Sequence, residues 1–422
     1  MQKCNCRLGG KDLTSAVLTY NQFFDDLKKC FVGRDRVIDN LRFAMVQKQH
    51  LLTFGPPGTS KTAIFDVLYS GLTEANGFHA ELSMFMTEDA LFGPYNPKKM
   101  REEGVLEHNV SGMLPEANVA RLGEFLDANM PLLRSTLSAL NERRMVRGRQ
   151  NLSIPLITAY CDTNTNPGTF LERHPEAWAV LDRFLFMAYV DYLSDPAEIT
   201  EMLLRFQGGN VTNLSGRLSI NLINELSRLT LEPPSIIKSE LIFRKLAQGM
   251  QEYRIQRRAA ISGDKLPGII LPEISDRRLC WASQVAEVNA ILNGREEVVA
   301  EDIVALKQVL GTTAAEEEMW VKIAAKIIEE VKEEQKMQLD HAQYIALEGL
   351  IKELDQIDPS AAADITALKQ LGENLMSLKR QVEIIVPEND QVASLSKRAS
   401  GIITDKTSAI RGHAATFAGM TN

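Results

Sequence analysis

The first half of the chain alternates between short apolar runs and stretches with the periodicity of amphipathic helices. The apolar runs lie at residues 51–54, 78–82, 119–122, 154–161 and 184–190. Continuous apolar runs of this kind are typical of parallel strands that are covered on both faces. Helices are expected before the first run, at residues 13–31 and 36–47, and between most of the other runs. The alternation predicts an α/β fold in which a parallel sheet lies between two layers of helices.

The pattern in the second half of the chain is helical. Pro233-Pro234 interrupts the chain, and helices are then expected at residues 236–257, 276–293 and 300–310. From residue 314 the composition shifts to charged residues that favour helices. Turns at Asp358-Pro359 and Val386-Pro387 divide this tail. The three helices expected in the tail lie at residues 314–357, 361–384 and 391–413, with a frayed end.

The segment between the first expected strand and the following helix has the spacing of a phosphate-binding loop. Its residues are Gly55, Pro56, Pro57, Gly58, Thr59, Ser60, Lys61 and Thr62. Glycines let backbone N–H groups converge on one anion, Lys61 supplies a positive charge for the β- and γ-phosphates, and Thr62 supplies a hydroxyl for Mg²⁺. Ser60 stands where glycine is usual, but its side chain is small. A plain Gly/Pro turn is the weaker alternative, because strand, loop, Lys-Thr pair and helix follow in order.

Composition narrows the kind of protein. The chain has 422 residues, of which 45% are hydrophobic, and a formal net charge of -8. The charge argues against a protein that coats nucleic acid, and no apolar stretch approaches the length of a membrane span. Five scattered cysteines suit a reducing compartment, and Cys4 and Cys6 are only weak candidates for a metal site. We therefore expect a soluble cytoplasmic protein with two or three domains.

Hydrolysis of a bound nucleotide needs a carboxylate near the phosphates. Glu124 follows the apolar run at residues 119–122, where its side chain could orient an attacking water. The residue before it should be an aspartate that holds Mg²⁺, but it is Gly123. Without that carboxylate we expect weaker binding of Mg²⁺ and slower turnover. The alternative is that Glu124 is an ordinary surface carboxylate.

A polar tip follows the apolar run at residues 154–161. An amide at this place offers both a donor and an acceptor, so it could bond the γ-phosphate and the water. Asn164 is the first choice for this role, and Asp162 is the second. The plainer interpretation is a turn-forming asparagine before Pro167.

Three arginines are further candidates for phosphate contacts. Arg183 ends a helical segment, from which it could reach the γ-phosphate of a neighbouring subunit. Arg277 and Arg278 lie in the first turn of a helix that Ser275 would cap. Cations at a helix N-terminus oppose the macrodipole, so a phosphate partner would explain them. The alternative is that these arginines are solvated surface residues.

In this order, the motifs resemble the MoxR family of AAA+ ATPases, and within it most closely the RavA branch. Further stretches carry the resemblance. They are LFGP at residues 91–94, REEG at residues 101–104, SGMLPEA at residues 111–117, TLSALNER at residues 136–143, and SDRR at residues 275–278 with Asn293-Gly294-Arg295 and Asp302. Together with the phosphate loop they cover residues 31–310.

The resemblance implies roles for individual residues. Lys61 and Thr62 match the Walker A pair, Glu124 the Walker B glutamate, Asn164 the sensor-1 amide, Arg183 the arginine finger, and Arg277 or Arg278 the sensor-2 arginine. The family also implies a P-loop αβα domain with a β-hairpin inserted near residues 91–114, an all-α lid, and a homo-hexamer that binds ATP and Mg²⁺ between its subunits. We therefore expect a nucleotide-binding core with N-terminal helices at residues 1–230, the lid at 231–312 and a three-helix extension at 313–422.

Enzymes of this family are ATPases that remodel protein complexes as chaperones do, often with a partner that carries a von Willebrand factor A (vWA) domain. Two other functions stay open. Because Gly123 departs from the family pattern, the chain could be a nucleotide-gated scaffold that assembles but hydrolyses little. A DNA-translocating motor is the other alternative, and Lys98, Lys99 and Arg101 give it some support. Glu102, Glu103 and Glu107 follow these residues at once, which argues against a nucleic-acid partner.

Overall fold

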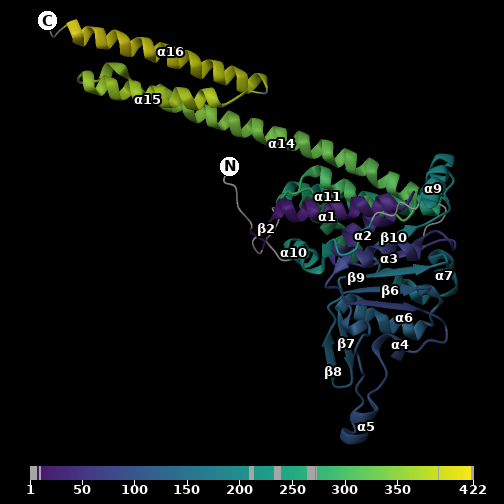
Figure 1. Ribbon diagram of the computed structural model, residues 1–422. Helices are drawn as coiled ribbons and strands as arrows, with labels where there is room; N and C mark the ends of the chain where they lie inside the picture. The colour runs from purple at the N-terminus through teal and green to yellow at the C-terminus, as the bar shows by residue number, and fades with distance from the viewer. Residues whose placement is uncertain are drawn as a thin grey trace. The chain divides into compact units, whose positions relative to one another are not determined.

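The chain divides into two compact units, Met1–Ile328 and Glu329–Asn422 (Figure 1). The computed structural model describes residues 7–8, 11–208, 213–231, 239–263, 271, 273–387 and 389–419. Three sequence predictions lie outside these residues: the Cys4 and Cys6 pair, the interruption at Pro233-Pro234, and the frayed end after residue 419.

The core of the first unit is a five-stranded parallel sheet. In their order across the sheet, its strands are β10 (Phe186–Tyr189), β3 (Leu51–Phe54), β9 (Thr158–Thr163), β6 (Val119–Gly123) and β5 (Gly77–Glu81). Each neighbouring pair is parallel, so all five carboxyl ends lie at one edge. The predicted α/β fold is thereby confirmed. β9 begins at Thr158, beyond Pro155, which has no N–H group to offer a neighbouring strand.

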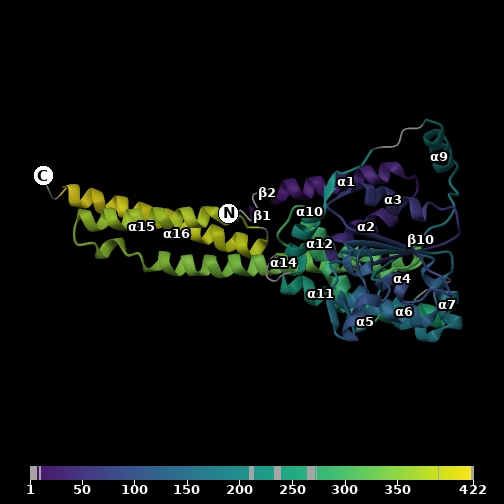
Figure 2. The ribbon, with the colours of Figure 1, turned by 60° about the horizontal axis from the view of Figure 1, so that its bottom comes forward.

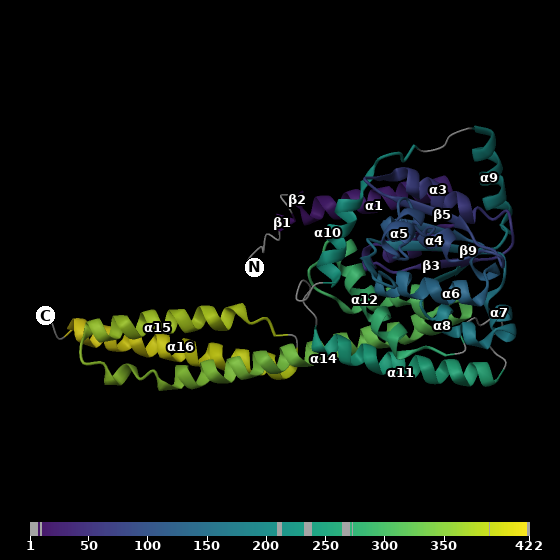
Figure 3. The same cartoon turned by 90° about the horizontal axis from the view of Figure 1, so that it is seen from below.

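Helices cover both faces of this sheet. α1 (Leu13–Cys30) and α3 (Lys61–Gly71) lie on one side, and α6 (Met130–Leu137) and α7 (Pro167–Arg173) on the other (Figures 2 and 3). Side chains alternate between the two faces along each strand. Leu52 and Phe54 of β3 point into a cluster with Leu132 and Leu133 of α6. The helices thus bury the strands on both faces, and the strand ends carry the candidate site.

Near residues 91–114, where the resemblance places a hairpin, two arms of the segment between β5 and β6 pair antiparallel, but over a single bridge and with helices beside it. This fully described segment forms α4 (Asp89–Phe92) and α5 (Pro97–Glu103), and its arms meet in one antiparallel bridge between Tyr95 and His108. Pro97 starts α5, and the Asn96 side chain caps it by accepting hydrogen bonds from the Lys98 and Lys99 backbone. A hairpin does occur later, where β7 (Arg144–Arg147) pairs with β8 (Gln150–Ser153).

Further helices follow the sheet in the first unit. They are α9 (Pro196–Gly208), α10 (Ile220–Leu231), α11 (Glu240–Ser262), α12 (Asp276–Leu292), a 3₁₀ stretch η5 (Ala300–Leu306) and α13 (Lys307–Leu310). α10 and α12 both pack against α2 (Asp35–Gln47), which also contacts the sheet. The helix expected at residues 236–257 is α11, which runs from Glu240 to Ser262. The helix expected at residues 300–310 is 3₁₀ over its first part.

Three helices make up the second unit, as the sequence predicts. α14 (Ala314–Gln356) begins in the first unit, and α15 (Ile365–Ile384) packs along α16 (Asp390–Gly419). Leu354, Leu378 and Val392 contribute to their shared core. α15 starts later than expected, because Asp364 caps it by accepting a hydrogen bond from the Ala367 N–H group at 2.7 Å.

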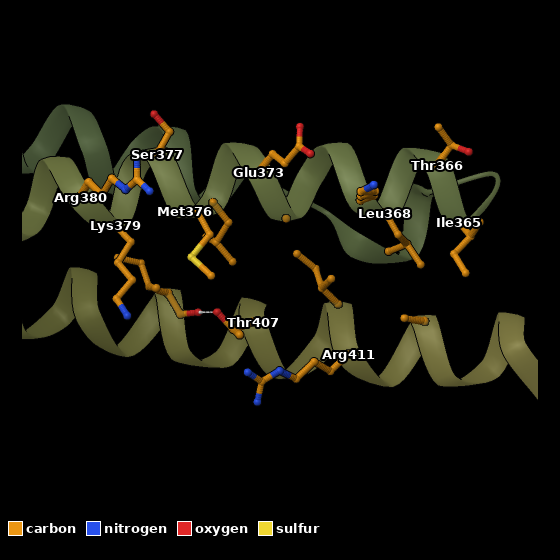
Figure 4. A pocket seen from close by; sticks show the side chains of 16 residues that line it. Ile365, Thr366, Leu368, Glu373, Met376, Ser377, Lys379, Arg380, Thr407 and Arg411 are labelled. Atoms are coloured by element: carbon orange, nitrogen blue, oxygen red, sulfur yellow. Dashed lines mark hydrogen bonds between the residues drawn. The ribbon is translucent and has the colours of Figure 1, made fainter.

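A groove of about 860 Å³ lies between α15 and α16 (Figure 4). Ile365 and Met376 line it with apolar side chains, and Lys379, Arg380 and Arg411 add positive charge. The predicted site residues all lie in the first unit instead. In the described parts of the chain, no helix combines the length and the apolarity needed to cross a bilayer.

Candidate active site

The phosphate loop joins the end of β3 to the start of α3, as the sequence predicts. Gly55 has a φ of 145°, and a Cβ atom there would lie 2.1 Å from the Val190 carbonyl oxygen, so only glycine fits. Ser60 has a φ of 66°, a left-handed conformation that costs residues other than glycine about 1 kcal/mol or more. No side chain caps the N-terminus of α3. Its first backbone N–H groups are therefore available to an anion.

Lys61 folds back into this loop. Its Nζ donates to the carbonyl oxygens of Gly55 and Pro56 at 2.8 and 2.7 Å, and to Asn164 Oδ1 at 3.1 Å. Burial lowers the pKa of Lys61, while Asp162 and Glu124 act in the opposite direction. The ammonium group thus lies inside the loop, where the oxygens of a bound phosphate could replace the backbone carbonyls as acceptors.

Glu124 and Asn164 meet at the carboxyl ends of β6 and β9. Asn164 Nδ2 donates to Glu124 Oε1 at 2.6 Å, and the Asn164 backbone N–H donates to Glu124 Oε2 at 3.4 Å. Burial is the largest cause of the raised pKa of Glu124. A raised pKa suits a carboxylate that accepts a proton from water. One row of contacts therefore runs from Lys61 through Asn164 to Glu124, and the structure brings these three predicted residues together.

Arg121 on β6 is a charged residue that belongs to none of the sequence motifs. It is 6% exposed, and its Nε and Nη2 donate to the two carboxylate oxygens of Asp162 at 2.8 and 3.1 Å. Its Nη1 donates to Glu81 Oε1 at 2.5 Å, and Nη2 also donates to Thr62 Oγ1 at 3.1 Å. Asp162, the second choice for the amide role, is thus the partner of a buried cation. The signal in the sequence was an arginine inside an apolar strand.

Gly123 leaves room for this cluster. A Cβ atom at Gly123 would lie 1.9 Å from Glu81 Oε2 and 2.7 Å from Arg121 Nη2. The carboxylate of Glu81 and the guanidinium of Arg121 therefore occupy the space that an aspartate side chain at residue 123 would need. The missing carboxylate and the buried arginine belong to one arrangement.

These residues, as they lie, do not fit Mg²⁺. The ion needs oxygen ligands at about 2.1 Å, and the Thr62 hydroxyl oxygen already accepts a hydrogen bond from Arg121. A metal ion on this oxygen would have to displace the guanidinium, which Asp162 and Glu81 hold in place. In the described parts of the chain, no three His, Cys, Asp or Glu side chains are arranged to hold a metal ion. Thr62 could become a metal ligand only if Arg121 moved.

Two of the predicted arginines, Arg183 and Arg277, are neighbours of Asp182. Arg183 is half-buried after α8 (Trp178–Leu181), and burial lowers its pKa, with Arg277 acting in the same direction. Arg277 Nη1 lies 3.5 Å from Asp182 Oδ2. Arg183 Nη1 donates to the Ala179 carbonyl oxygen at 3.1 Å.

Arg278 has a structural role. It is 1% exposed, and its Nε, Nη1 and Nη2 donate to the carbonyl oxygens of Val309, Phe184 and Leu185 at 3.0, 2.8 and 2.7 Å. Burial lowers its pKa to about 10. All three nitrogens join α12 to neighbouring backbone. Arg277, whose side chain is 43% exposed, is therefore the better sensor-2 candidate of the pair.

A hollow of about 270 Å³ adjoins the phosphate loop. Its lining combines apolar and basic side chains with Ser60: Phe31, Val32, Leu193, Met202 and Phe206 are apolar, and Lys29, Arg34 and Arg205 are basic. Arg34 Nε also donates to the Thr59 carbonyl oxygen at 3.1 Å. Apolar walls beside a phosphate-binding loop suit a planar base. These residues could not be recognised from the sequence, because they come from loops and from α9, far apart along the chain.

Comparison with known families decides which fold family this is. The profile of the MoxR domain in the MoxR-vWA-beta-propeller ternary systems matches residues 19–230. The chain belongs to the MoxR family of AAA+ ATPases. An AAA lid domain profile matches residues 268–324, from before α12 into α14. The first match of this MoxR protein includes the sheet, the phosphate loop and Arg183, and the second includes Arg277.

Relatives of this MoxR protein are distant. An uncharacterized protein of Methanocaldococcus jannaschii is 26% identical over 86% of this chain and 84% of its own length, and a second one is 27% identical over 68% and 69%. A structural protein of Acidianus two-tailed virus is 25% identical over 40% of this chain and 28% of its own. A crystal structure described as a candidate ATPase from Cytophaga hutchinsonii, 18% identical, covers 75% of this chain and 95% of its own with a TM-score of 0.56. This likeness supports the fold.

Proposed function

We propose that this MoxR protein binds ATP at its phosphate loop and hydrolyses it, as an assembly that remodels a protein complex in a chaperone-like way. The observation that carries the proposal is the row of contacts from Lys61 through Asn164 to Glu124. The row places a cation for phosphate oxygens beside a carboxylate that can orient water. Membership of the MoxR family supports ATP as the nucleotide.

Each residue of the row has its own task in this mechanism. The first N–H groups of α3 and the ammonium group of Lys61 hold the β- and γ-phosphates. Asn164 links the γ-phosphate to Glu124, and Glu124 accepts a proton from the attacking water. Arg183 stabilises the transition state across a subunit interface, with Arg277 beside it. Mg²⁺ with Thr62 as a ligand is expected from the family, but no step here depends on it.

We propose a homo-hexamer with the nucleotide between subunits, which the family supports and in which Arg183 and Arg277, whose described contacts are with Ala179 and Asp182, would serve a neighbouring subunit. A protein with a vWA domain is the proposed partner, which the name of the matching domain supports. In this proposal residues 1–230 form the nucleotide-binding core, 231–312 the lid and 313–422 the helical extension. The proposed location is the cytoplasm, and the RavA branch is the proposed nearest group.

Two substitutions test the site. Lys61→Ala should abolish ATP binding, because it removes the ammonium group from the loop. Glu124→Gln should retain ATP and stop its hydrolysis, since orienting water matters only in the transition state. Titration calorimetry measures binding, and phosphate release measures turnover. Lys98→Ala is the matched control, because it removes an exposed lysine from α5 rather than from the loop.

The outcomes separate the possible functions. Unchanged ATP affinity in Lys61→Ala would reject the site, and unchanged turnover in Glu124→Gln would move the search for the base to Asp127. If the unmodified protein binds ATP but releases phosphate no faster than a protein-free blank, the chain is a nucleotide-gated scaffold. The Arg121 guanidinium beside Gly123 favours this second candidate. A DNA-translocating motor has less support, because Lys99 of α5 is paired with an acidic side chain of its own segment.

A further inference from the structure

We propose that the Arg121 guanidinium supplies the positive charge that a magnesium ion would otherwise supply at this nucleotide site. The site therefore binds nucleoside triphosphates without magnesium. The proposal rests on the proposed function, since it concerns the form in which ATP binds at the phosphate loop. In the bound state Arg121, which lies beside Thr62, donates a hydrogen bond to a phosphate oxygen. Before the nucleotide binds, Glu81 accepts the hydrogen bond from the same guanidinium nitrogen.

The guanidinium is fixed at the wall of the anion site. Asp162 holds it through two hydrogen bonds, and both side chains are buried. Nη2 of Arg121 reaches Thr62 Oγ1 at 3.1 Å, and Thr62 is the second residue of α3. A phosphate held by the first N–H groups of α3 lies beside Thr62. It is therefore within reach of Arg121.

The third partner of the guanidinium can be replaced. Nη1 of Arg121 donates to Glu81 Oε1 at 2.5 Å, but the Glu81 side chain is 61% exposed, whereas that of Asp162 is 6% exposed. An exposed carboxylate leaves an arginine at little cost, and a buried one does not. Glu81 therefore turns into solvent, and a phosphate oxygen takes its place on Nη1. Arginine pairs with phosphate as readily as with carboxylate.

This exchange keeps the local charge balanced without a metal ion. One anionic oxygen of the phosphate replaces one carboxylate, and Asp162 stays in place to hold the guanidinium. A dication added to the same place would have to displace the guanidinium from the Thr62 hydroxyl oxygen. The magnesium complex of ATP should therefore bind no better than free ATP.

The first test compares ATP binding by the full-length protein with excess EDTA and with excess magnesium chloride. Titration calorimetry should give two Kd values that agree within about threefold, whereas a magnesium-dependent site loses at least about tenfold in EDTA. A Kd more than about threefold lower with magnesium would overturn the proposal. If ATP binds in neither condition, the proposed function itself fails, so the two failures can be told apart.

The second test removes the replaceable partner. Glu81→Gln should lower the Kd for free ATP by about tenfold, because a hydrogen bond to a charged group contributes roughly that factor to binding. Asp66→Asn is the matched control, because it removes an exposed carboxylate from α3 that is not a partner of Arg121. Equal effects of the two substitutions, or weaker binding in Glu81→Gln, would overturn the exchange of Glu81 for phosphate.

Discussion

His50 holds a neutral imidazole in the core just before β3. Its Nδ1 accepts a hydrogen bond from the Ala159 N–H group at 3.0 Å, and its Nε2 donates to the Leu140 carbonyl oxygen at 2.5 Å. Burial lowers its pKa to about 3, against about 6.5 in an unfolded chain. The unfolded state therefore takes up the proton first, and stability should fall as the pH drops from 6.5 towards 3. We expect a loss of about 1.4 kcal/mol between pH 7.5 and 5.5.

Urea titration followed by tryptophan fluorescence measures this loss. Trp178, Trp281 and Trp320 all belong to the first unit, so the signal reports on the part of the chain that contains His50. His50→Gln is the control, because glutamine can donate and accept but does not titrate. Its pH dependence should be smaller by the expected amount. The same pH dependence in both proteins would contradict the assignment to His50.

The residues of the site differ in how far the sequence could identify them. Lys61, Glu124 and Asn164 each follow the end of a strand, and the carboxyl ends of parallel strands meet at one edge, so their proximity could be predicted. The partners of Arg121 come from two other strands and from α3. Which residues face each other depends on the register across three strands. That register cannot be read from the sequence of any single strand.

An ion pair joins α11 to the beginning of α14. Arg257 Nε donates to Glu316 Oε1 at 2.7 Å, and the two side chains are 2% and 1% exposed. Arg257→Met would bury the carboxylate without its cation, so we expect a loss of about 3–5 kcal/mol in the free energy of unfolding. The neighbouring substitution Arg258→Met removes an exposed pair with Glu273 and should cost at most about 1 kcal/mol. Similar losses in the same urea titration would rule out a special role for the buried pair.

Local signals predicted most helices and strands, and they also explain why the pairing near residues 91–114 is short. β3 and α12 follow from periodicity, caps and apolar runs, because their sequence carries its own boundaries. In the segment near residues 91–114, Asn96 and Pro97 start a helix, and the antiparallel pairing of the two arms therefore stops next to Tyr95. β7 and β8 escaped prediction because RMVR and QNLS contain few apolar residues in alternation.

Assembly should decide whether the protein hydrolyses ATP. If Arg183 serves a neighbouring subunit, an isolated subunit should be nearly inactive, since such arginines contribute about a thousandfold or more to turnover. Arg183→Ala should therefore bind ATP and lose activity. Mixing Arg183→Ala with Glu124→Gln should restore part of the turnover, because some interfaces then combine an intact Glu124 with an intact Arg183.

Phosphate release from the mixture measures this rescue, with each variant alone as the control. Size-exclusion chromatography establishes that the two variants form mixed assemblies. If mixed assemblies form and turnover is not restored, Arg183 either acts on the nucleotide of its own subunit or has only a structural role. The proposed site at a subunit interface would then be wrong.

The place of β3 between β9 and β10 has a consequence for biosynthesis. Both partner strands come from residues more than a hundred positions later in the chain. A ribosome adds roughly 5–20 residues per second, so β3 waits on the order of ten seconds for its first partner. All four of its side chains are buried in the finished sheet, and in that interval they and both strand edges are exposed. Translation past Thr163 is the earliest moment at which the phosphate loop can be held in place, so a nascent chain that ends sooner should be a client of chaperones and proteases.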